Sequence, residues 1–256
     1  MLLASIAAGL VCRWLQRRAA GRAARATADA PPDPPRLLLG LAIGFGSIVL
    51  AAAGFAFIAL QLRGDGVLGR FDDALTEAIG THLPRGGLEL FALLTHLGDV
   101  GVLVTLSVLI AALLWRAGRR ALALGWSLSV AGNGLLNPVL KRIFERARPV
   151  HDHGLAFETG FSFPSGHSSG SMVVYGMLFY LGLRLLPARW HPLLAAAATA
   201  LVVTTASSRI FLQVHFASDV AAGLLSGLAW LAVCITSIEW ARHRRRRTAA
   251  AAARSA

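Results

Sequence analysis

The sequence predicts an all-α membrane protein whose chain crosses a bilayer six times. Of its 256 residues, 55% are hydrophobic and only 15% are charged, and the mean hydropathy is +0.61. A bilayer core about 30 Å thick needs roughly 20 apolar residues per helix. Because hydrocarbon offers the backbone no hydrogen-bond partners, each apolar run near this length is predicted to be a helix. The runs are residues 37–62, 100–115, 121–140, 168–186, 192–208 and 220–238.

The chain before the first run is predicted to stay out of the bilayer core. Residues 1–11 are apolar but short, and arginines follow them, whereas a cleaved signal peptide carries its positive charges in front. We expect an interfacial or cytoplasmic start here, with a seventh span as the alternative. The following residues are rich in Ala, Arg and Pro, which is typical of an unfolded linker. The sequence thus divides into an N-terminal segment (1–36), a six-span domain (37–240) and a basic tail (241–256).

The positive charge falls mainly on one side of the predicted bundle. The formal net charge is +12, and Lys141 is the only lysine among 25 basic residues. Seventeen of the 25 lie in the two tails and the two connections on the tail side, together with only three of the 13 acidic residues. By the positive-inside rule this side is cytoplasmic, and both termini lie there. The basic excess therefore indicates a multi-pass cell-membrane protein in contact with anionic lipid, and it does not call for a nucleic-acid partner.

Three connections remain for the outer face. Residues 63–99 contain two stretches with helical apolar spacing, 71–82 and 87–97, which we expect to be amphipathic helices at the outer interface. The connections 141–167 and 209–219 hold most of the polar chemistry. Basic residues there break the charge rule, which suggests that function keeps them on this face.

The second connection opens with two cations that suit a phosphate. Lys141 and Arg148 are seven residues apart, so on a helix continuing from the third span both would project from one face, until Pro149 ends the helix. A guanidinium binds phosphate as a bidentate fork, and an ammonium binds it as a point charge. The alternative is that both side chains only reach toward lipid headgroups at a helix end.

The same connection closes with a predicted helix N-terminus. Pro164-Ser165-Gly166-His167 stands immediately before the fourth span. Unpaired N–H groups at the positive end of a helix dipole form a natural anion site, and His167 would lie beside the anion. An ordinary N-cap with an incidental histidine is the alternative. Glu158 and Phe161, ahead of this turn, are candidates for gating residues.

The third connection pairs a histidine with a carboxylate. His215 and Asp219 are four residues apart, so on a helix Asp219 would accept the imidazole N–H and leave the other ring nitrogen as a lone pair. Arg209 adds a further guanidinium. A salt-bridged interfacial turn is the alternative, but an Asp that opens an apolar span is costly without a partner, which favours function.

The three stretches together resemble the type 2 phosphatidic acid phosphatase (PAP2) superfamily. Its pattern is K-x6-RP, then PSGH, then SR-x5-H-x3-D, and the chain matches each part without departure, from Lys141 to Asp219. The resemblance covers the last four spans and their outer loops. It implies an integral membrane lipid phosphatase with its active site on the outer face.

The resemblance also implies a phosphohistidine mechanism. His215, aligned by Asp219, would be the nucleophile, and His167 would protonate the leaving oxygen and then activate water. The phosphate oxygens would be stabilised by five groups: Lys141, Arg148, Arg209 and the N–H groups of Ser165 and Gly166. Three fixed cations leave no need for a metal or another cofactor.

The substrate implied is a phosphate or pyrophosphate on a lipid held in the outer leaflet. Phosphatidate, phosphatidylglycerol phosphate and undecaprenyl pyrophosphate all fit. Two other readings stay open: a lipid phosphotransferase that uses the same phosphohistidine, and a non-catalytic lipid-binding or transport bundle. The oligomeric state stays open as well.

Two further patterns are not expected to bind metal. His151 and His153 would point the same way only on a strand, and no further ligand follows them in order. Cys12 and Cys234 lie far apart in apolar stretches and are interpreted as packing residues.

Overall fold

The structure is a computed structural model, and it describes residues 34–62 and 66–255. Over these residues the chain is helical and contains no strand. The expectations for residues 1–33 lie outside the described part. The elements are α2 (Pro34–Gln61), α3 (Val67–His82), α4 (Arg85–Leu94), η1 (Thr95–Gly98), α5 (Val100–Arg116), α6 (Arg120–Phe144), α7 (Gly166–Leu185), η2 (Ala188–Trp190), α8 (His191–Phe211) and α9 (Ala217–Ser255).

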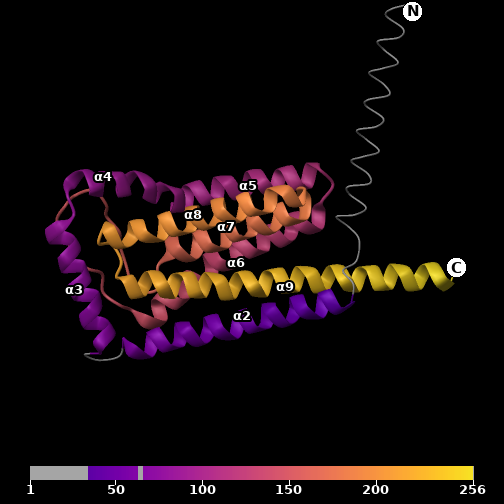
Figure 1. Cartoon of the computed structure of the whole chain (residues 1–256), viewed down its shortest axis with the longest axis horizontal. Coiled ribbons are helices and arrows are strands. Elements are labelled where there is room, and N and C mark those ends of the chain that lie inside the picture. The colour runs from indigo at the N-terminus through magenta and orange to yellow at the C-terminus, as the bar shows by residue number, and fades with distance from the viewer. Residues whose placement is uncertain (1–33, 63–65, 256) are drawn as a thin grey trace, which may run out of the picture.

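Each of the six predicted apolar runs forms one long helix, and these helices lie side by side (Figure 1). By length and composition, four helical stretches of the described chain can cross a membrane: Leu38–Gln61, Arg85–Arg116, Ala188–Phe211 and Ala217–Thr248. Large hydrophobic side chains point outward along the bundle, as in Leu50 and Leu128, and lipid contact accounts for so much exposed apolar surface. The remaining two long helices, α6 and α7, are more polar because α6 ends in Lys141-Arg142 and α7 begins with several Ser and Gly residues.

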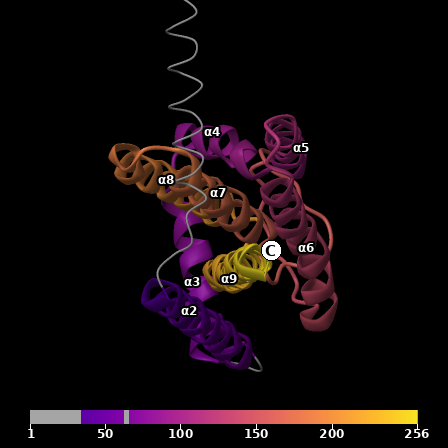
Figure 2. The same cartoon turned by 90° about the vertical axis from the view of Figure 1, so that its right-hand side faces the viewer.

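Helix α7 forms the centre of the bundle. It packs against α8, α9, α6 and α5, as the end-on view in Figure 2 shows, whereas α2 packs mainly against α9. The buried core around α7 includes Trp126, Val174 and Met177. Glycines on α9 let it approach α7 closely, because a Cβ at Gly223 would lie 2.5 Å from the carbonyl oxygen of Ser165. This contact sets the second turn of α9 against the start of α7.

The first outer connection closes one end of the bundle. Its two predicted amphipathic stretches form α3 and α4, and α3 lies across the helix ends in Figure 1. Gln213 holds α3 in place by donating from Nε2 to the carbonyl oxygen of Thr76 at 2.7 Å. Phe91 of α4 stacks on Phe211 of α8 with ring centroids 4.3 Å apart. The prediction of helices here is confirmed, and they cover the loops that carry the motifs.

One predicted helical segment is wrong. Helix α6 ends at Phe144, because Glu145 adopts the left-handed conformation with φ of 46°. Residues 145–150 are therefore not helical, and Lys141 and Arg148 do not share a helix face. At the other end of the chain, α9 continues without a break from the predicted sixth span through most of the basic tail.

Candidate active site

The end of the bundle under α3 collects the side chains of all three motifs. Lys141 comes from the last turn of α6, Arg209 from the last turn of α8 and Asp219 from the first turn of α9. A cavity of about 540 Å³ opens here between α5, α6 and α7. Five of the eight predicted site residues line it: Lys141, Arg148, Gly166, His167 and His215. The other three, Ser165, Arg209 and Asp219, are buried next to it.

His215 is buried with one ring nitrogen turned toward an arginine and the other toward acidic and hydroxyl groups. Arg148 Nη1 lies 3.1 Å from His215 Nε2. A guanidinium can only donate, so Nε2 accepts and the ring proton is on Nδ1. Burial lowers the pKa of His215 to about 4, against the opposing effect of Asp219. The imidazole is therefore neutral near pH 7 and keeps a lone pair on Nε2.

Asp219 lies beside His215 as predicted, but at the distance of an ion pair and not of a direct hydrogen bond. His215 precedes α9, so the two residues are not one helical turn apart, and His215 Nδ1 lies 3.6 Å from Asp219 Oδ2. Ser162 Oγ donates a short hydrogen bond to Asp219 Oδ2 and lies 3.3 Å from His215 Nδ1. The Phe216 N–H donates to the same carboxylate oxygen at 2.9 Å. Ser162 therefore bridges the pair.

Arg146 connects Asp219 to the outer helix α3. Its Nη1 lies 2.6 Å from Asp219 Oδ1, and its Nη2 lies 2.8 Å from Asp72 Oδ2. Ser218 also binds Asp72, through its N–H at 3.1 Å and through its hydroxyl group. Both carboxylates are fully buried and Arg146 is largely so. One guanidinium thus neutralises two buried acids from segments far apart in the sequence.

His167 lines the cavity and has two acidic neighbours. Its Nε2 is 3.0 Å from Asp99 Oδ1, and its Nδ1 is 3.8 Å from Glu158 Oε1. Burial and the charge of Arg209 lower the pKa of His167, while Asp99 and Glu158 act to raise it. Without an anion in the cavity, the neutral form is favoured near pH 7, and a bound anion would favour the imidazolium.

The predicted cations converge, although not in the predicted way. Lys141 Nζ and Arg148 Nη2 donate to the same carbonyl oxygen, that of Phe161, at 2.6 and 3.2 Å. Arg148 also donates from Nη1 to the Val214 carbonyl oxygen at 2.8 Å, so the loop fixes the guanidinium on two sides. Arg209 Nη1 donates to Thr95 Oγ1 at 2.6 Å. The non-helical path of residues 145–150 brings Lys141 and Arg148 together, where sequence spacing suggested a shared helix face.

Glu158 places a carboxylate among these positive groups. It forms a short ion pair with Arg209 Nη2, and its Oε2 lies 3.9 Å from Arg148 Nη2. Burial acts to raise the pKa of Glu158, but Arg209, His167 and Arg148 outweigh it and lower the pKa. The side chain is therefore ionised. Its carboxylate occupies the place beside Arg209 and Arg148 where a bound phosphate would lie.

The start of α7 departs from the prediction in one respect. Ser165 is the N-cap, and its Oγ accepts from the Ser168 N–H at 3.4 Å. Its own N–H donates to the carbonyl oxygen of Asp219 at 3.0 Å, so the predicted role of this N–H in binding phosphate is wrong for this structure. Gly166 lines the cavity, and the helix leaves the first-turn N–H groups of Gly166 and His167 without an intrahelical partner.

The histidine pair at 151 and 153 stays a separate feature. The two rings stack at 4.3 Å, and His153 accepts from the Leu155 N–H at Nδ1 and contacts the Leu212 carbonyl oxygen through Nε2 at 2.9 Å. Both nitrogens of His153 are therefore engaged. Among the residues that the structure describes, no group of three or more His, Cys, Asp or Glu is arranged to hold a metal ion.

Sequence reasoning missed five residues of the site: Ser162, Arg146, Asp72, Asp99 and Thr95. Arg146 carried a weak signal, because it is one of the basic residues on the outer side that break the charge rule. The other four stand outside the three motifs and have no pattern of their own.

Known proteins resemble this chain in sequence and in fold. A family model described as PAP2 superfamily matches residues 121–243. The phosphatidylglycerophosphatase B of Bacillus subtilis is 35% identical over 142 residues, which are 55% of this chain and 70% of that protein. A lipid A 1-phosphatase of Rhizobium etli is 35% identical over 182 residues, covering 62% of this chain and 74% of the relative.

A solved structure agrees with these matches. The crystal structure of a transmembrane PAP2 type phosphatidylglycerolphosphate phosphatase from Bacillus subtilis superposes with a TM-score of 0.69 at 29% identity. The match covers 73% of this chain and 94% of that one. The fold, the four apolar spans and these relatives identify the chain as a multi-pass membrane protein of the PAP2 superfamily, and its relatives indicate a membrane lipid phosphatase.

Proposed function

We propose that this protein hydrolyses a phosphomonoester or diphosphate on a membrane lipid through a phosphohistidine at His215, without a metal ion. The observation that carries the proposal is the state of His215, a neutral imidazole whose Nε2 lone pair lies next to Arg148 in a cavity lined by cations. A neutral imidazole is nucleophilic near pH 7 without metal activation. Arg148, Lys141 and Arg209 supply the positive charge that a metal supplies in other phosphatases.

The first half of the reaction transfers the phosphoryl group to the protein. Nε2 of His215 attacks phosphorus while the bond from phosphorus to the lipid oxygen breaks, and Arg148 moves its N–H from Nε2 to a phosphate oxygen. The bound phosphate favours the imidazolium form of His167, which gives its proton to the departing lipid oxygen. Asp219, through Ser162, holds the Nδ1–H tautomer and offsets the positive charge that develops on the His215 ring.

The second half returns the protein to its starting state. His167 is now neutral and accepts a proton from a water molecule, whose oxygen attacks phosphorus. The bond between phosphorus and Nε2 breaks, inorganic phosphate leaves and the lone pair of His215 is restored. The same two histidines thus serve both halves.

The shape of the cavity supports a lipid substrate. Beyond the charged residues the cavity continues along apolar side chains of three helices, among them Val104 of α5, Val130 of α6 and Val173 of α7. A phosphate held by the cations would therefore have its acyl or prenyl chain directed between helices. The relatives act on phosphatidylglycerophosphate or lipid A according to their names, and we propose a substrate of this kind, with phosphatidylglycerol phosphate, phosphatidate and undecaprenyl pyrophosphate as candidates.

We also propose that α6 and α7 cross the membrane beside the four apolar spans, which gives six crossings. The excess of arginine at the end far from the cavity supports a topology with both termini in the cytoplasm and the active site on the outer face.

Phosphate release in the presence of EDTA tests this function. The purified full chain in detergent should release inorganic phosphate from at least one of the three candidate lipids, at a rate that EDTA leaves unchanged. Loss of activity in EDTA with recovery in Mg²⁺ would contradict the metal-free mechanism. Transfer of phosphate to an added lipid acceptor, with no release to water, would identify a phosphotransferase instead.

Replacing Glu158 should strengthen the binding of phosphate. In Glu158→Gln the guanidinium of Arg209 loses its internal anion, so inorganic phosphate no longer competes with a carboxylate for it. We expect the inhibition constant of inorganic phosphate to fall about tenfold, which corresponds to about 1.4 kcal/mol. Asp152→Asn is the matched control, because Asp152 is an exposed carboxylate of the same loop. An inhibition constant that rises in Glu158→Gln would show that Glu158 orients Arg209 for substrate.

The pH dependence of turnover should report His167. Its pKa in the empty site lies below the usual 6.5, so kcat/KM should decline as the pH rises through a value below 6.5, because the imidazolium donor is lost. The corresponding decline of kcat should lie at higher pH, since bound phosphate stabilises the imidazolium. In Asp99→Asn the limb of kcat/KM should move to lower pH, because Asp99 acts to raise the pKa of His167. The pKa of the substrate cannot move with this substitution, so an unchanged limb would contradict the assignment.

A further inference from the structure

A second basic pocket lies at the end of the bundle opposite the active site. It has a volume of about 560 Å³ and is formed by the turn between α5 and α6 and by the extension of α9. Among the nine described residues that line it, none is acidic and five are arginines: Arg119, Arg120, Arg242, Arg245 and Arg246. Glu239, one turn before Arg242 on α9, pairs with Arg184 at 3.4 Å and with the Tyr180 hydroxyl. Five guanidinium groups therefore line the pocket, and its described lining contains no carboxylate.

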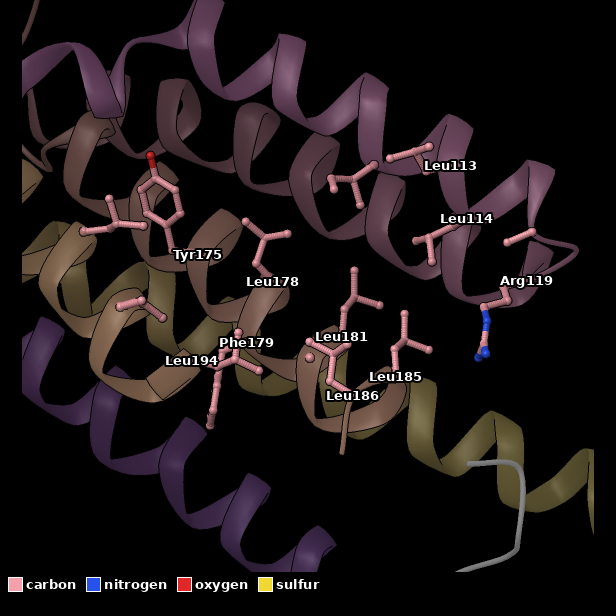
Figure 3. Close-up of a pocket in the computed structure, with 16 residues that line it drawn as sticks. Leu113, Leu114, Arg119, Tyr175, Leu178, Phe179, Leu181, Leu185, Leu186 and Leu194 are labelled. Atoms are coloured by element: carbon pink, nitrogen blue, oxygen red, sulfur yellow. The ribbon is translucent and has the colours of Figure 1, made fainter. Parts of the chain in front are cut away.

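An apolar groove adjoins this pocket. It holds about 550 Å³ and runs between α5, α7 and α8, with Ala117 and Arg119 shared between groove and pocket. Figure 3 shows leucine side chains such as Leu114, Leu178 and Leu185 along the groove, and the Arg119 guanidinium at one end. All the other lining residues except Tyr175 are apolar. The groove and the basic pocket together have the polarity of a phospholipid, with an anion-binding part at the membrane surface and an apolar part at membrane depth.

Groove and pocket are separate from the catalytic cavity. The two share none of their lining residues with it, and the cavity extends between α5 and α6 toward Val104 and Val130, whereas the groove lies on the α8 side of α7. A lipid in the groove would therefore leave the substrate site open.

We propose that groove and pocket bind one anionic phospholipid from the leaflet at this end, the cytoplasmic leaflet in the topology proposed above. The arginines bind the phosphodiester headgroup, because planar guanidinium groups match phosphate oxygens in bidentate geometry. One acyl chain lies along the groove. A soluble phosphate would leave the groove unfilled, and a zwitterionic lipid has no net negative charge to balance the arginines, so an anionic lipid fits both parts.

Thermal unfolding with defined lipids tests this site without using enzyme activity. The full chain in neutral detergent is supplemented with dioleoylphosphatidylserine, with dioleoylphosphatidylcholine, or with glycerophosphoserine, the headgroup without its chains. Phosphatidylserine is a phosphodiester and therefore not a substrate for the proposed reaction. We expect it alone to raise the unfolding midpoint, by about 5 °C, and native mass spectrometry should count one bound molecule. An equal shift with phosphatidylcholine or with the free headgroup would overturn the proposal.

Charge-matched variants distinguish a specific lipid site from general attraction of anionic lipid to a basic surface. Arg119→Gln/Arg245→Gln removes two arginines of the pocket and should lose at least half of the shift. Arg244→Gln/Arg247→Gln removes the same amount of charge from α9 outside the pocket, where Arg244 lies against Trp240, and should keep the shift. Equal losses in both would overturn the proposal.

A second pair of variants tests whether the acyl chain lies in the groove. It also tests the proposal if the arginine variants fold poorly. Ala197→Trp fills the groove from α8 and should reduce the shift, whereas Ala200→Trp adds the same bulk at an exposed position of α8 outside the groove and should not. An undiminished shift in Ala197→Trp would overturn the placement of the chain.

Discussion

Replacing His215 with alanine should reduce phosphate release from lipid by at least about 10⁴-fold, because removal of a covalent nucleophile costs rate losses of this order. The cations and the first turn of α7 would still bind the phosphate, so KM should change far less than kcat. Brief incubation with ³²P-labelled lipid, followed by quenching in alkali to preserve phosphohistidine, should label the unmodified protein and leave His215→Ala unlabelled. The structural reason is that Nε2 of His215 is the ring nitrogen that accepts from Arg148 beside the cavity.

The other site variants should lose less activity than His215→Ala. His167→Ala should slow turnover severely, since the lipid oxygen must then leave unprotonated. Asp219→Asn should slow it less, because the nucleophile remains while its alignment through Ser162 weakens. His151→Ala is the matched control, because this histidine does not line the cavity. A labelled phosphoenzyme or substantial activity in His215→Ala would refute the assignment of the nucleophile.

Replacing Arg146 with methionine should destabilise the protein by about 3–5 kcal/mol, the cost of removing one partner from a buried ion pair. Asp72 and Asp219 are both fully buried, and Arg146 lies within 2.8 Å of each. Without Arg146, the carboxylates of Asp72 and Asp219 repel each other in a poorly solvated site. Activity should fall as well, because Asp219 loses one of the groups that hold it beside Ser162 and His215. Thermal unfolding in detergent and lipid phosphatase turnover measure the two effects.

A second substitution separates stability from catalysis in this network. Asp72→Asn in the Arg146→Met background removes one of the two uncompensated charges and should recover part of the lost stability, while Asp219 stays misaligned and turnover stays low. Arg142→Met is the matched control, because Arg142 is exposed on the last turn of α6, four residues before Arg146. If Arg146→Met were as stable as Arg142→Met, the ion pairs of Arg146 with Asp72 and Asp219 would contribute nothing to stability.

The number and place of the long helices could be predicted from sequence because their cause is local. A run of apolar residues in hydrocarbon has to pair its own backbone groups, and only a helix does so within one segment. The end of α6 escaped prediction for a related reason. Glu145 adopts the left-handed conformation that usually requires glycine. No glycine in residues 141–148 therefore indicates the helix end that brings Arg148 back toward Lys141.

By itself, the sequence determined the helical membrane fold and, through three motifs with fixed spacing, a resemblance to phosphatases that the relatives support. Tertiary structure alone decided how the site residues interact. Ser162 bridges His215 and Asp219, Asp72 neutralises Arg146 across 74 positions of the chain, and Glu158 fills the space beside Arg209. The physical reason is that a buried polar group must find a partner wherever packing places one. At Gly223, α9 approaches α7 closely, and this packing brings Asp219 next to the start of α7. The Ser165 N–H, which the sequence predicts to bind phosphate, therefore donates to the Asp219 carbonyl oxygen instead.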